Sequence, residues 1–342
     1  MAIDLSDLVP FPAETNPHID AARIHLDRWV RQFGVIRKEA SARRFARADF
    51  AWFAGRTYPT ADESDLQLVG DCFAWLFLLD DQLDDGSVGR DLNQVAGIKQ
   101  ALAVILLGPH RPARKPAESD SAAQAPLVNA LADLWWRLDG RTTSAWRHRF
   151  FRHVAAGAMA ALWEAQNRVY NIVPDEDDYI QQRRHTGAIY VCMDFIDVVE
   201  RIDIPVDVYE SPLFQDTLKA ACDVVCWTND IFSLEKEHSL GERHNLVSVV
   251  EHHRRLTRQQ AVAHVAQAIA AEVQRFVDLE PQLLQHFEAH HEPLAKYLAG
   301  MRSWMRGNFD WSSSTRRYRE LEAPAEHQES GYLESNMIFP SR

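Results

Sequence analysis

The sequence predicts an all-α protein, because the spacing of its apolar residues is helical in one segment after another. Long stretches place apolar residues three and four positions apart, which gathers them on one face of a helix. Few stretches alternate apolar and polar residues with a period of two, and β-branched runs bounded by turn residues are scarce. The clearest helical segments are residues 66–79, 127–138, 146–169, 213–234 and 261–287.

Chain length and the gaps between these segments indicate the domain organisation. A chain of 342 residues, 46% of them hydrophobic, has enough apolar side chains for a sizeable core in one domain or two. Residues 109–126 lack an apolar period and predict a mobile surface loop, and residues 320–342 predict a polar tail with a few anchoring apolar side chains. Helices on both sides of the loop need a common packing partner, so we expect residues 1–342 to form one domain.

Net charge and cysteine usage argue against several classes of protein. The formal net charge of -12 argues against a nucleic-acid-binding surface, which would need clustered Lys and Arg. An anionic substrate is compatible with this charge when divalent cations lie between carboxylate and phosphate. No signal peptide and no apolar run of about 18 residues is visible. The sequence therefore predicts a cytoplasmic protein that does not span a membrane, and its four cysteines predict no disulfide framework.

Four aspartates follow a strongly apolar segment: Asp80, Asp81, Asp84 and Asp85 come after the run FAWLFLL. In a helix, Asp80 and Asp84 lie one turn apart on the same face, where two carboxylates can share hard cations such as Mg²⁺. A helix C-terminus disfavours negative charge, so this placement costs stability and hints at function. The alternative is a solvated acidic helix end, which is how most charge runs behave.

A second polar group lies in the segment NDIFSLEKE at 229–237. Asn229, Ser233 and Glu237 are spaced at i, i+4 and i+8, which forms an oblique stripe of oxygen ligands along one helix face. Lys236 adjoins this stripe and can bind a phosphate as a point charge. The alternative is an ordinary polar helix face, but Asn and Ser are weak helix formers and their mid-helix position asks for a reason.

The pair of motifs DDQLD at 80–84 and NDIFSLEKE at 229–237 resembles the aspartate-rich and NSE motifs of class I terpene synthases, particularly the bacterial terpene cyclases. The resemblance implies a single helical bundle with a central active-site cavity. It also implies three magnesium ions, with Asp80 contributing to two of them, and a diphosphate-binding role for Lys236. The third ion would be held by Asn229, Ser233 and Glu237.

Further residues match the same family pattern. Arg183 lies 46 positions before the stripe, where the family places its diphosphate-sensing arginine, and Thr186 and Gly187 match the linker and effector positions of the helix break. Arg317 and Tyr318 match the C-terminal pair that grips diphosphate and closes the site, and Arg317 would also pair with the aspartate cluster on closure. Guanidinium groups suit this work because they bind phosphate oxygens bidentately.

For Arg183 and Arg184 the alternative is a surface pair that faces the acidic run 175–178. That run spells D-x-D-D, which resembles the motif of class II terpene cyclases. Because it follows Pro174, we instead expect it to form the first turn of a helix.

Three aromatic residues are candidates for the apolar wall that a carbocation needs. Phe77 and Trp311 resemble pocket positions of the family, and Trp304 is a weaker candidate. Core packing is the alternative for all three. The position nine residues after Arg183, aromatic in some relatives, is Cys192 here.

The resemblance therefore implies an enzyme that ionises an isoprenoid diphosphate, with Asp81 and Asp84 supporting Asp80 through closure contacts and through hydrogen bonds that orient the ligands. Farnesyl diphosphate, giving a sesquiterpene hydrocarbon or alcohol, is the expected substrate, and geranylgeranyl diphosphate is the alternative. A chain-elongating prenyl diphosphate synthase would carry a second aspartate-rich motif in place of the stripe. A non-catalytic isoprenoid-binding protein would not need every ligand position filled, as it is here. A homodimer is also compatible with the sequence.

Overall fold

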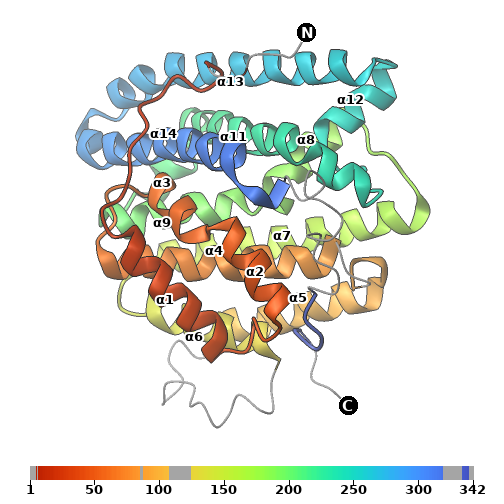
Figure 1. The fold of residues 1–342 in the computed structure, drawn as a ribbon. Coiled ribbons are helices and arrows are strands. Elements are labelled where there is room, and N and C mark those ends of the chain that lie inside the picture. The colour runs from red at the N-terminus through yellow and green to blue at the C-terminus, as the bar shows by residue number, and fades with distance from the viewer. Residues whose placement is uncertain (1–4, 6, 85–87, 108–124, 319–332, 339–342) are drawn as a thin grey trace. The chain divides into compact units, whose positions relative to one another are not determined.

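A computed structural model of the chain describes residues 5, 7–84, 88–107, 125–318 and 333–338, and all regular secondary structure in these ranges is helical (Figure 1). The predicted all-α class is confirmed. Each segment with helical spacing lies in a helix, apart from Phe287, which is the C-cap of α13. These helices are α4 (Glu63–Asp84), α6 (Pro126–Leu138), α7 (Ser144–Tyr170), α11 (Pro212–Ser239) and α13 (Arg258–His286). No helix of the described ranges is both long and apolar enough to cross a membrane.

The chain divides into two compact units that each combine several stretches of sequence. Unit 1 comprises Met1–Pro17, Gly55–Ala61 and Ile172–Ser314, and unit 2 comprises His18–Ala54, Asp62–Asn171 and Thr315–Arg342. The single domain over residues 1–342 and its central cavity stay predictions.

Unit 1 is built around α11, which packs against α13 and against α14 (His291–Ser314). Residues 220–228 of α11 are all buried, so this helix is apolar around much of its circumference. Gly300 of α14 permits a close helix contact, because a Cβ atom there would lie 2.7 Å from the side chain of Ile196. The remaining elements are α8 (Glu176–Thr186), α9 (Ile189–Glu200), α10 (Val206–Tyr209), α12 (Leu246–Arg254) and η3 (Glu288–His290).

Unit 2 is built around α4, which packs against α1 (Ile19–Gln32) and α6. A buried polar network joins these three helices: His25 Nε2 lies 2.8 Å from Asp71 Oδ2, and Arg137 Nη1 donates to the same oxygen at 2.7 Å. Burial raises the pKa of Asp71, and the bonds from His25 and Arg137 oppose that rise. The other elements are α2 (Glu39–Ala48), η1 (Val88–Arg90), α5 (Leu92–Leu106), α7 and η4 (Arg316–Tyr318), and α3 (Phe50–Thr57) contributes residues to both units.

The structure describes only a few residues of the predicted loop and of the predicted tail. Residues 109–124 lie outside the described residues, and the predicted boundary at 126 is wrong because Pro126 is the first residue of α6, a position where a missing N–H costs nothing. In the tail, Met337 and Ile338 are buried, which confirms the anchoring apolar residues. Residues 320–332 and 339–342 lie outside the described residues.

Candidate active site

The aspartate cluster, defined as Asp80, Asp81 and Asp84, occupies the last turn of α4. This helix is buried on all sides over residues 68–75 and half-buried over residues 76–80, so its end leaves the core of unit 2. Asp80 is the most exposed of the three, at 45%, whereas Asp81 is 9% exposed. Asp85 lies outside the described residues.

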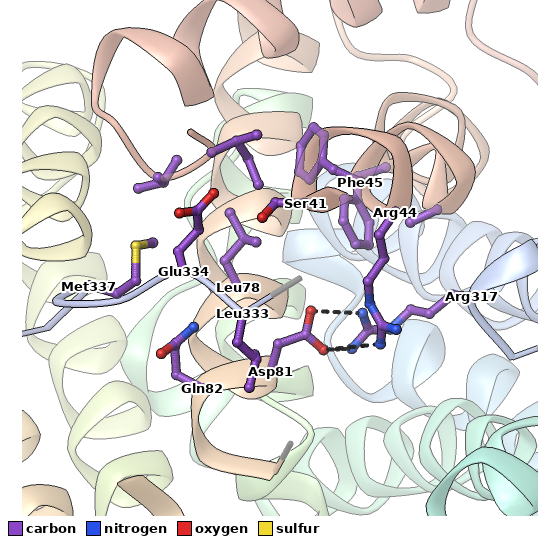
Figure 2. A pocket seen from close by; sticks show the side chains of 14 residues that line it. Ser41, Arg44, Phe45, Leu78, Asp81, Gln82, Arg317, Leu333, Glu334 and Met337 are labelled. Carbon is purple, nitrogen blue, oxygen red and sulfur yellow. Dashed lines mark hydrogen bonds and ion pairs between the residues drawn. The ribbon is translucent and has the colours of Figure 1, made fainter. Parts of the chain in front are cut away.

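Arg317 of η4 binds two members of the cluster, and its contact with Asp81 is drawn in Figure 2. Its Nη2 donates to Asp81 Oδ1 at 2.8 Å and to Asp80 Oδ2 at 3.3 Å, and its Nη1 donates to Asp81 Oδ2 at 3.2 Å. The expected pairing between this arginine and the aspartates is therefore present. A second cation, Arg44 of α2, lies 3.9 Å from Asp81 Oδ1. A buried carboxylate needs such partners, because an unpaired charge away from water is costly.

Asp84 has a different partner. Arg168 of α7 donates to Asp84 Oδ1 at 2.5 Å, and the aspartate side chain is 25% exposed. One of the two carboxylates expected to share a cation is therefore engaged by a guanidinium group in this structure. Asp80 and Asp84 as metal ligands stay predictions.

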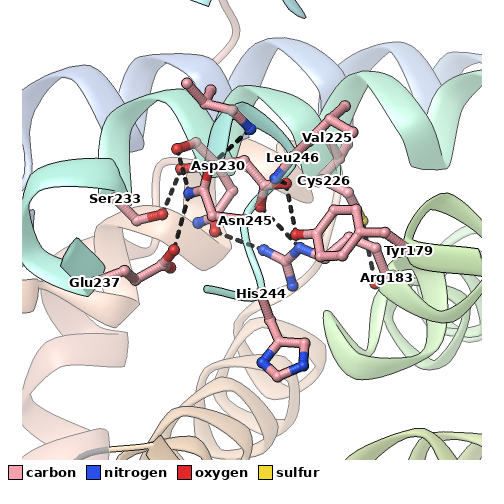
Figure 3. Close-up of polar contacts among 12 residues, drawn as sticks. Tyr179, Arg183, Val225, Cys226, Asp230, Ser233, Glu237, His244, Asn245 and Leu246 are labelled. Atoms are coloured by element: carbon pink, nitrogen blue, oxygen red, sulfur yellow. Dashed lines mark hydrogen bonds and ion pairs between the residues drawn. The ribbon is translucent and has the colours of Figure 1, made fainter. Parts of the chain in front are cut away.

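The α11 stripe, defined as Asn229, Ser233 and Glu237, lies in unit 1. Figure 3 shows Ser233 and Glu237 projecting from the same side of α11. The Ser233 hydroxyl donates to the backbone oxygen of Asn229 at 2.8 Å, and Asn245 Nδ2 donates to Glu237 Oε2 at 2.9 Å. Lys236, next to the stripe, is half-buried. The amide, hydroxyl and carboxylate oxygens of the stripe are hard donors of the type that Mg²⁺ prefers.

Arg183 of α8 binds directly to this region of α11 (Figure 3). Its Nη2 donates to Asn229 Oδ1 at 2.8 Å, and its Nε donates to Asp230 Oδ1 at 2.8 Å. Asp230 is fully buried and also accepts from the Tyr179 hydroxyl at 2.8 Å and from the Leu246 backbone N–H at 3.0 Å. The guanidinium group thus contacts an oxygen of the stripe while a buried carboxylate holds it in place.

The chain breaks its helix directly after this arginine. Helix α8 ends at Thr186 and α9 begins at Ile189, with Ala188 in the left-handed region at φ 53°. Gly187 lets the Arg183 side chain pass, because a Cβ atom there would lie 2.9 Å from Arg183 Nη1 and 3.3 Å from Cys226 Sγ. The buried Thr186 hydroxyl has no hydrogen-bond partner among the described residues. Such an orphaned polar group is uncommon and suits a ligand-binding region.

Burial shifts the pKa of two groups here, the stripe residue Glu237 and the neighbouring Tyr179. It raises the pKa of Glu237 to about 7, the charge of Asp230 adds to the rise, and Arg183 and Asn245 oppose it. Burial also raises the pKa of the Tyr179 hydroxyl well above its usual value, so this group keeps its proton and donates a hydrogen bond to Asp230.

The contacts of Arg184 contradict the alternative that it forms a surface pair with Arg183. Its Nε and Nη2 donate to the two carboxylate oxygens of Asp223 on α11, both at 2.6 Å. The surface pair facing 175–178 is therefore wrong for both arginines, because the two side chains point from α8 toward α11. The acidic run itself is the first turn of α8, as expected, with Asp175 as the N-cap.

The aromatic candidates lie in different surroundings. In unit 2, Phe77 is half-buried, stacks on Phe50 with ring centroids 4.5 Å apart, and has Arg317 5.0 Å from its ring centroid. In unit 1, Trp304 and Trp311 are buried, and Trp304 packs edge-on against Tyr58. All three as cavity walls stay predictions, as do the roles of Tyr318, which is half-buried in η4, and of Lys236.

Three residues of the network were missing from the sequence analysis. Asp230 lies inside the NDIFS segment, but it is not part of the i, i+4, i+8 spacing that selects the stripe residues. Tyr179 has no local motif. Asn245 carried a usable signal, since Asn directly before an apolar run is a typical helix N-cap.

An all-α chain with an aspartate-ended helix and an Asn-Ser-Glu stripe has the features of a class I terpene synthase. The family model described as Terpene synthase family 2, C-terminal metal binding, matches residues 71–275. The chain belongs to this terpene synthase family and is an enzyme of the lyase class that acts on diphosphates. The match to a metal-binding domain supports a divalent metal cofactor.

Relatives resemble the chain over most of its length. The 10-epi-cubebol synthase of Sorangium cellulosum is 34% identical over 319 residues, which cover 92% of this chain and 98% of the relative. The (+)-T-muurolol synthase of Roseiflexus castenholzii, named as cyclising (2E,6E)-farnesyl diphosphate, is 33% identical and covers 90% and 92%. The crystal structure of germacradien-4-ol synthase from Streptomyces citricolor superposes with a TM-score of 0.75 at 28% identity, covering 90% of this chain and 97% of the other.

Proposed function

We propose that this terpene synthase is a magnesium-dependent cyclase that converts farnesyl diphosphate to a sesquiterpene hydrocarbon or alcohol and releases diphosphate. The observation that carries the substrate assignment is the similarity, over 90% of the chain, to a synthase named as cyclising farnesyl diphosphate. The oxygen-donor stripe on α11, with the Arg183 guanidinium group in contact with Asn229, supports the ionisation chemistry.

The donor set fits magnesium. Asn229, Ser233 and Glu237 supply an amide, a hydroxyl and a carboxylate oxygen, and Asp80 supplies the most exposed carboxylate of its cluster. We propose three ions, held by the stripe and by the aspartate cluster with Asp84 included. When bound, they neutralise the charge that develops on the leaving diphosphate.

The protein's own groups bind and orient the substrate. Arg183, Lys236 and Arg317 supply cationic donors for the diphosphate oxygens, and the Tyr318 hydroxyl adds a neutral donor. When the carbon–oxygen bond breaks, its electron pair leaves with the diphosphate and an allylic cation remains. Such a cation reacts at once with water, so the apolar residues must exclude solvent before ionisation. Phe77, Trp304 and Trp311 are the proposed aromatic faces that stabilise the cation.

One experiment separates this function from its alternatives. The protein is incubated with Mg²⁺ and, in turn, geranyl, farnesyl and geranylgeranyl diphosphate, and the volatile products are analysed by gas chromatography with mass detection. We expect a fifteen-carbon product from farnesyl diphosphate and its loss in Asp80→Ala and Asn229→Ala. A twenty-carbon product would indicate a diterpene synthase, longer diphosphates a chain-elongating enzyme, and no diphosphate release a binding protein.

A cytoplasmic location and a homodimer complete the proposal. Light scattering behind a size-exclusion column measures the mass of the particle against the 39.1 kDa of one chain. A mass of a single chain would contradict the homodimer and leave the assigned chemistry untouched.

A further inference from the structure

Asn245 is a fully buried residue at the junction between two helices of unit 1. It follows the loop that leaves α11 at Ser239, and it is the N-cap of α12. Its Oδ1 accepts from the Val247 backbone N–H at 2.9 Å, which is the usual bond of a capping residue. A cap alone needs only this acceptor, and Ser, Thr or Asp would supply it equally well.

The amide nitrogen of Asn245 makes two further bonds to α11 (Figure 3). Nδ2 donates to the backbone oxygen of Asp230 at 2.7 Å and to Glu237 Oε2 at 2.9 Å. An Asn side chain has two N–H donors and one carbonyl oxygen, so all of its groups are used. The first residue of α12 also binds α11, because the Leu246 N–H donates to Asp230 Oδ2.

These bonds fix the last member of the stripe. Glu237 has several rotatable bonds, and ordering its carboxylate before a ligand arrives removes an entropic cost from binding. A donor on Oε2 orients the group through that one oxygen. In metal sites, residues that orient the ligands affect affinity nearly as much as the ligands themselves.

We propose that Asn245 is a positioning residue that holds the Glu237 carboxylate for magnesium, in addition to capping α12. This inference rests on the proposed function, because it assumes that Glu237 is a metal ligand. It predicts that the two N–H donors matter for metal binding, whereas the acceptor matters for the stability of α12.

Two variants keep the cap and remove the donors. Asn245→Asp is nearly isosteric and retains an acceptor for the Val247 N–H, but it places an oxygen where Nδ2 donates to Glu237. Asn245→Ser retains a good capping oxygen on a shorter side chain that does not replace the two amide donors. The matched control is Thr257→Ala, which removes the cap of another helix, α13, where Thr257 Oγ1 accepts from the Gln260 N–H.

The measurement is isothermal titration of Mg²⁺ into each protein at a fixed concentration of inorganic diphosphate, with circular dichroism as the test of folding. We expect both variants at 245 to weaken magnesium binding by about 10- to 100-fold. Thr257→Ala should lower the melting temperature but leave magnesium binding within twofold of wild type. In steady-state assays, the magnesium concentration for half-maximal rate should rise more than the KM for farnesyl diphosphate.

The outcomes separate the inference from the function on which it rests. If folded Asn245→Ser and Asn245→Asp both bind magnesium with the affinity of the wild type, the positioning role is wrong and the proposed function stays intact. A loss of magnesium affinity in Thr257→Ala as large as that at 245 also overturns it, because general destabilisation would then explain both. Absence of magnesium binding in the wild type refutes the proposed function itself, and the inference with it.

Discussion

The aspartate cluster on α4 and the stripe on α11 hold their oxygens in different ways. In unit 2, cationic side chains bind the carboxylates: Arg317 contacts Asp80 and Asp81, and Arg168 contacts Asp84. In unit 1, the stripe has one carboxylate, Glu237, which accepts from a neutral amide, and the one guanidinium group bound to the stripe, that of Arg183, contacts the amide oxygen of Asn229. The fully buried carboxylate of Asp230 directly follows the stripe residue Asn229 in the sequence.

This difference shows two ways of keeping oxygen ligands in a folded chain before a metal binds. Clustered carboxylates repel one another, so guanidinium groups stabilise them at the end of α4. A divalent cation that binds there must displace these guanidinium groups or bind beside them. The α11 stripe has a single carboxylate and spreads its donors over three residue types, and Arg183 opposes the repulsion between Glu237 and the nearby Asp230. Substitutions in the two units should therefore differ in their effects.

Removing the fully buried carboxylate of Asp230 in unit 1 should cost the most. Asp230→Ala leaves the Arg183 guanidinium without its charged partner and the Tyr179 hydroxyl and Leu246 N–H without an acceptor. We expect the free energy of unfolding to fall by about 3–5 kcal/mol. Urea denaturation followed by circular dichroism measures it.

The counterpart in unit 2 is Asp84→Ala, whose aspartate is a quarter exposed and pairs with Arg168. Solvent screening should limit its cost to about 1 kcal/mol. Equal losses in the two variants would contradict the contrast between a buried and a partly solvated charge.

Arg317 is the cation on which the aspartate cluster depends most. Arg317→Met removes the donors to Asp80 and Asp81, and we expect kcat to fall by about 10²–10³-fold, the usual loss for one donor to a developing negative charge. Arg317→Lys should recover only part of the rate, because an ammonium group cannot reproduce the forked contact. Single-turnover kinetics measure both variants, and a lysine variant with wild-type rate would contradict the need for the fork.

Glu334 in the tail tests the pH dependence of unit 2. It accepts from the backbone N–H groups of Arg37 and Lys38, both at 2.7 Å. Burial opposes ionisation, but these N–H groups and the Ser41 hydroxyl hold the pKa of Glu334 below its usual 4.5. Because the folded pKa is lower than the unfolded one, the stabilisation is complete above about pH 4.5 and is lost as the pH falls through the folded pKa.

We therefore expect Glu334→Gln to lower the free energy of unfolding by about 2 kcal/mol at pH 7 and by much less near pH 3. Denaturation with urea at the two pH values measures this difference. The comparison variant in unit 1 is Glu176→Gln, since Glu176 pairs with the half-exposed Arg254. Its effect should stay below about 1 kcal/mol, and a cost for Glu334→Gln that does not change with pH would rule out the carboxylate as its source.

The sequence could predict whatever depends on helical spacing. The periodicity of residues 213–234 and the i, i+4, i+8 stripe follow from the geometry of one helix, so both were found without a structure. The pairing of Asp84 with Arg168 and of Arg184 with Asp223 depends on which helices pack together, and local spacing carries no such information. The expected contact between Arg317 and the aspartates came from family resemblance, across more than 230 positions of sequence.

Substitutions at two glycines, one in each unit, have the smallest expected effect and test whether the Arg183 side chain is fixed beside the α11 stripe. Gly187→Ala would place a Cβ atom 2.9 Å from Arg183 Nη1 and 3.1 Å from the Arg183 backbone oxygen. The side chain can shift but the backbone cannot, so we expect a loss of about 1 kcal/mol in unfolding free energy. The displaced guanidinium should also weaken diphosphate binding, measured by titration of inorganic diphosphate with Mg²⁺.

Gly70→Ala in α4 is the matched control, because among the described residues no atom outside its own stretch of helix lies within 4 Å of the added Cβ. Alanine is the better helix former at such a position, and we expect a gain of about 0.4–1 kcal/mol with unchanged diphosphate binding. Opposite signs for the two substitutions would show that Gly187 is required by the path of the Arg183 side chain. A gain in both would mean that Arg183 moves aside at no cost, and the fixed placement of this arginine beside the α11 stripe would then be wrong.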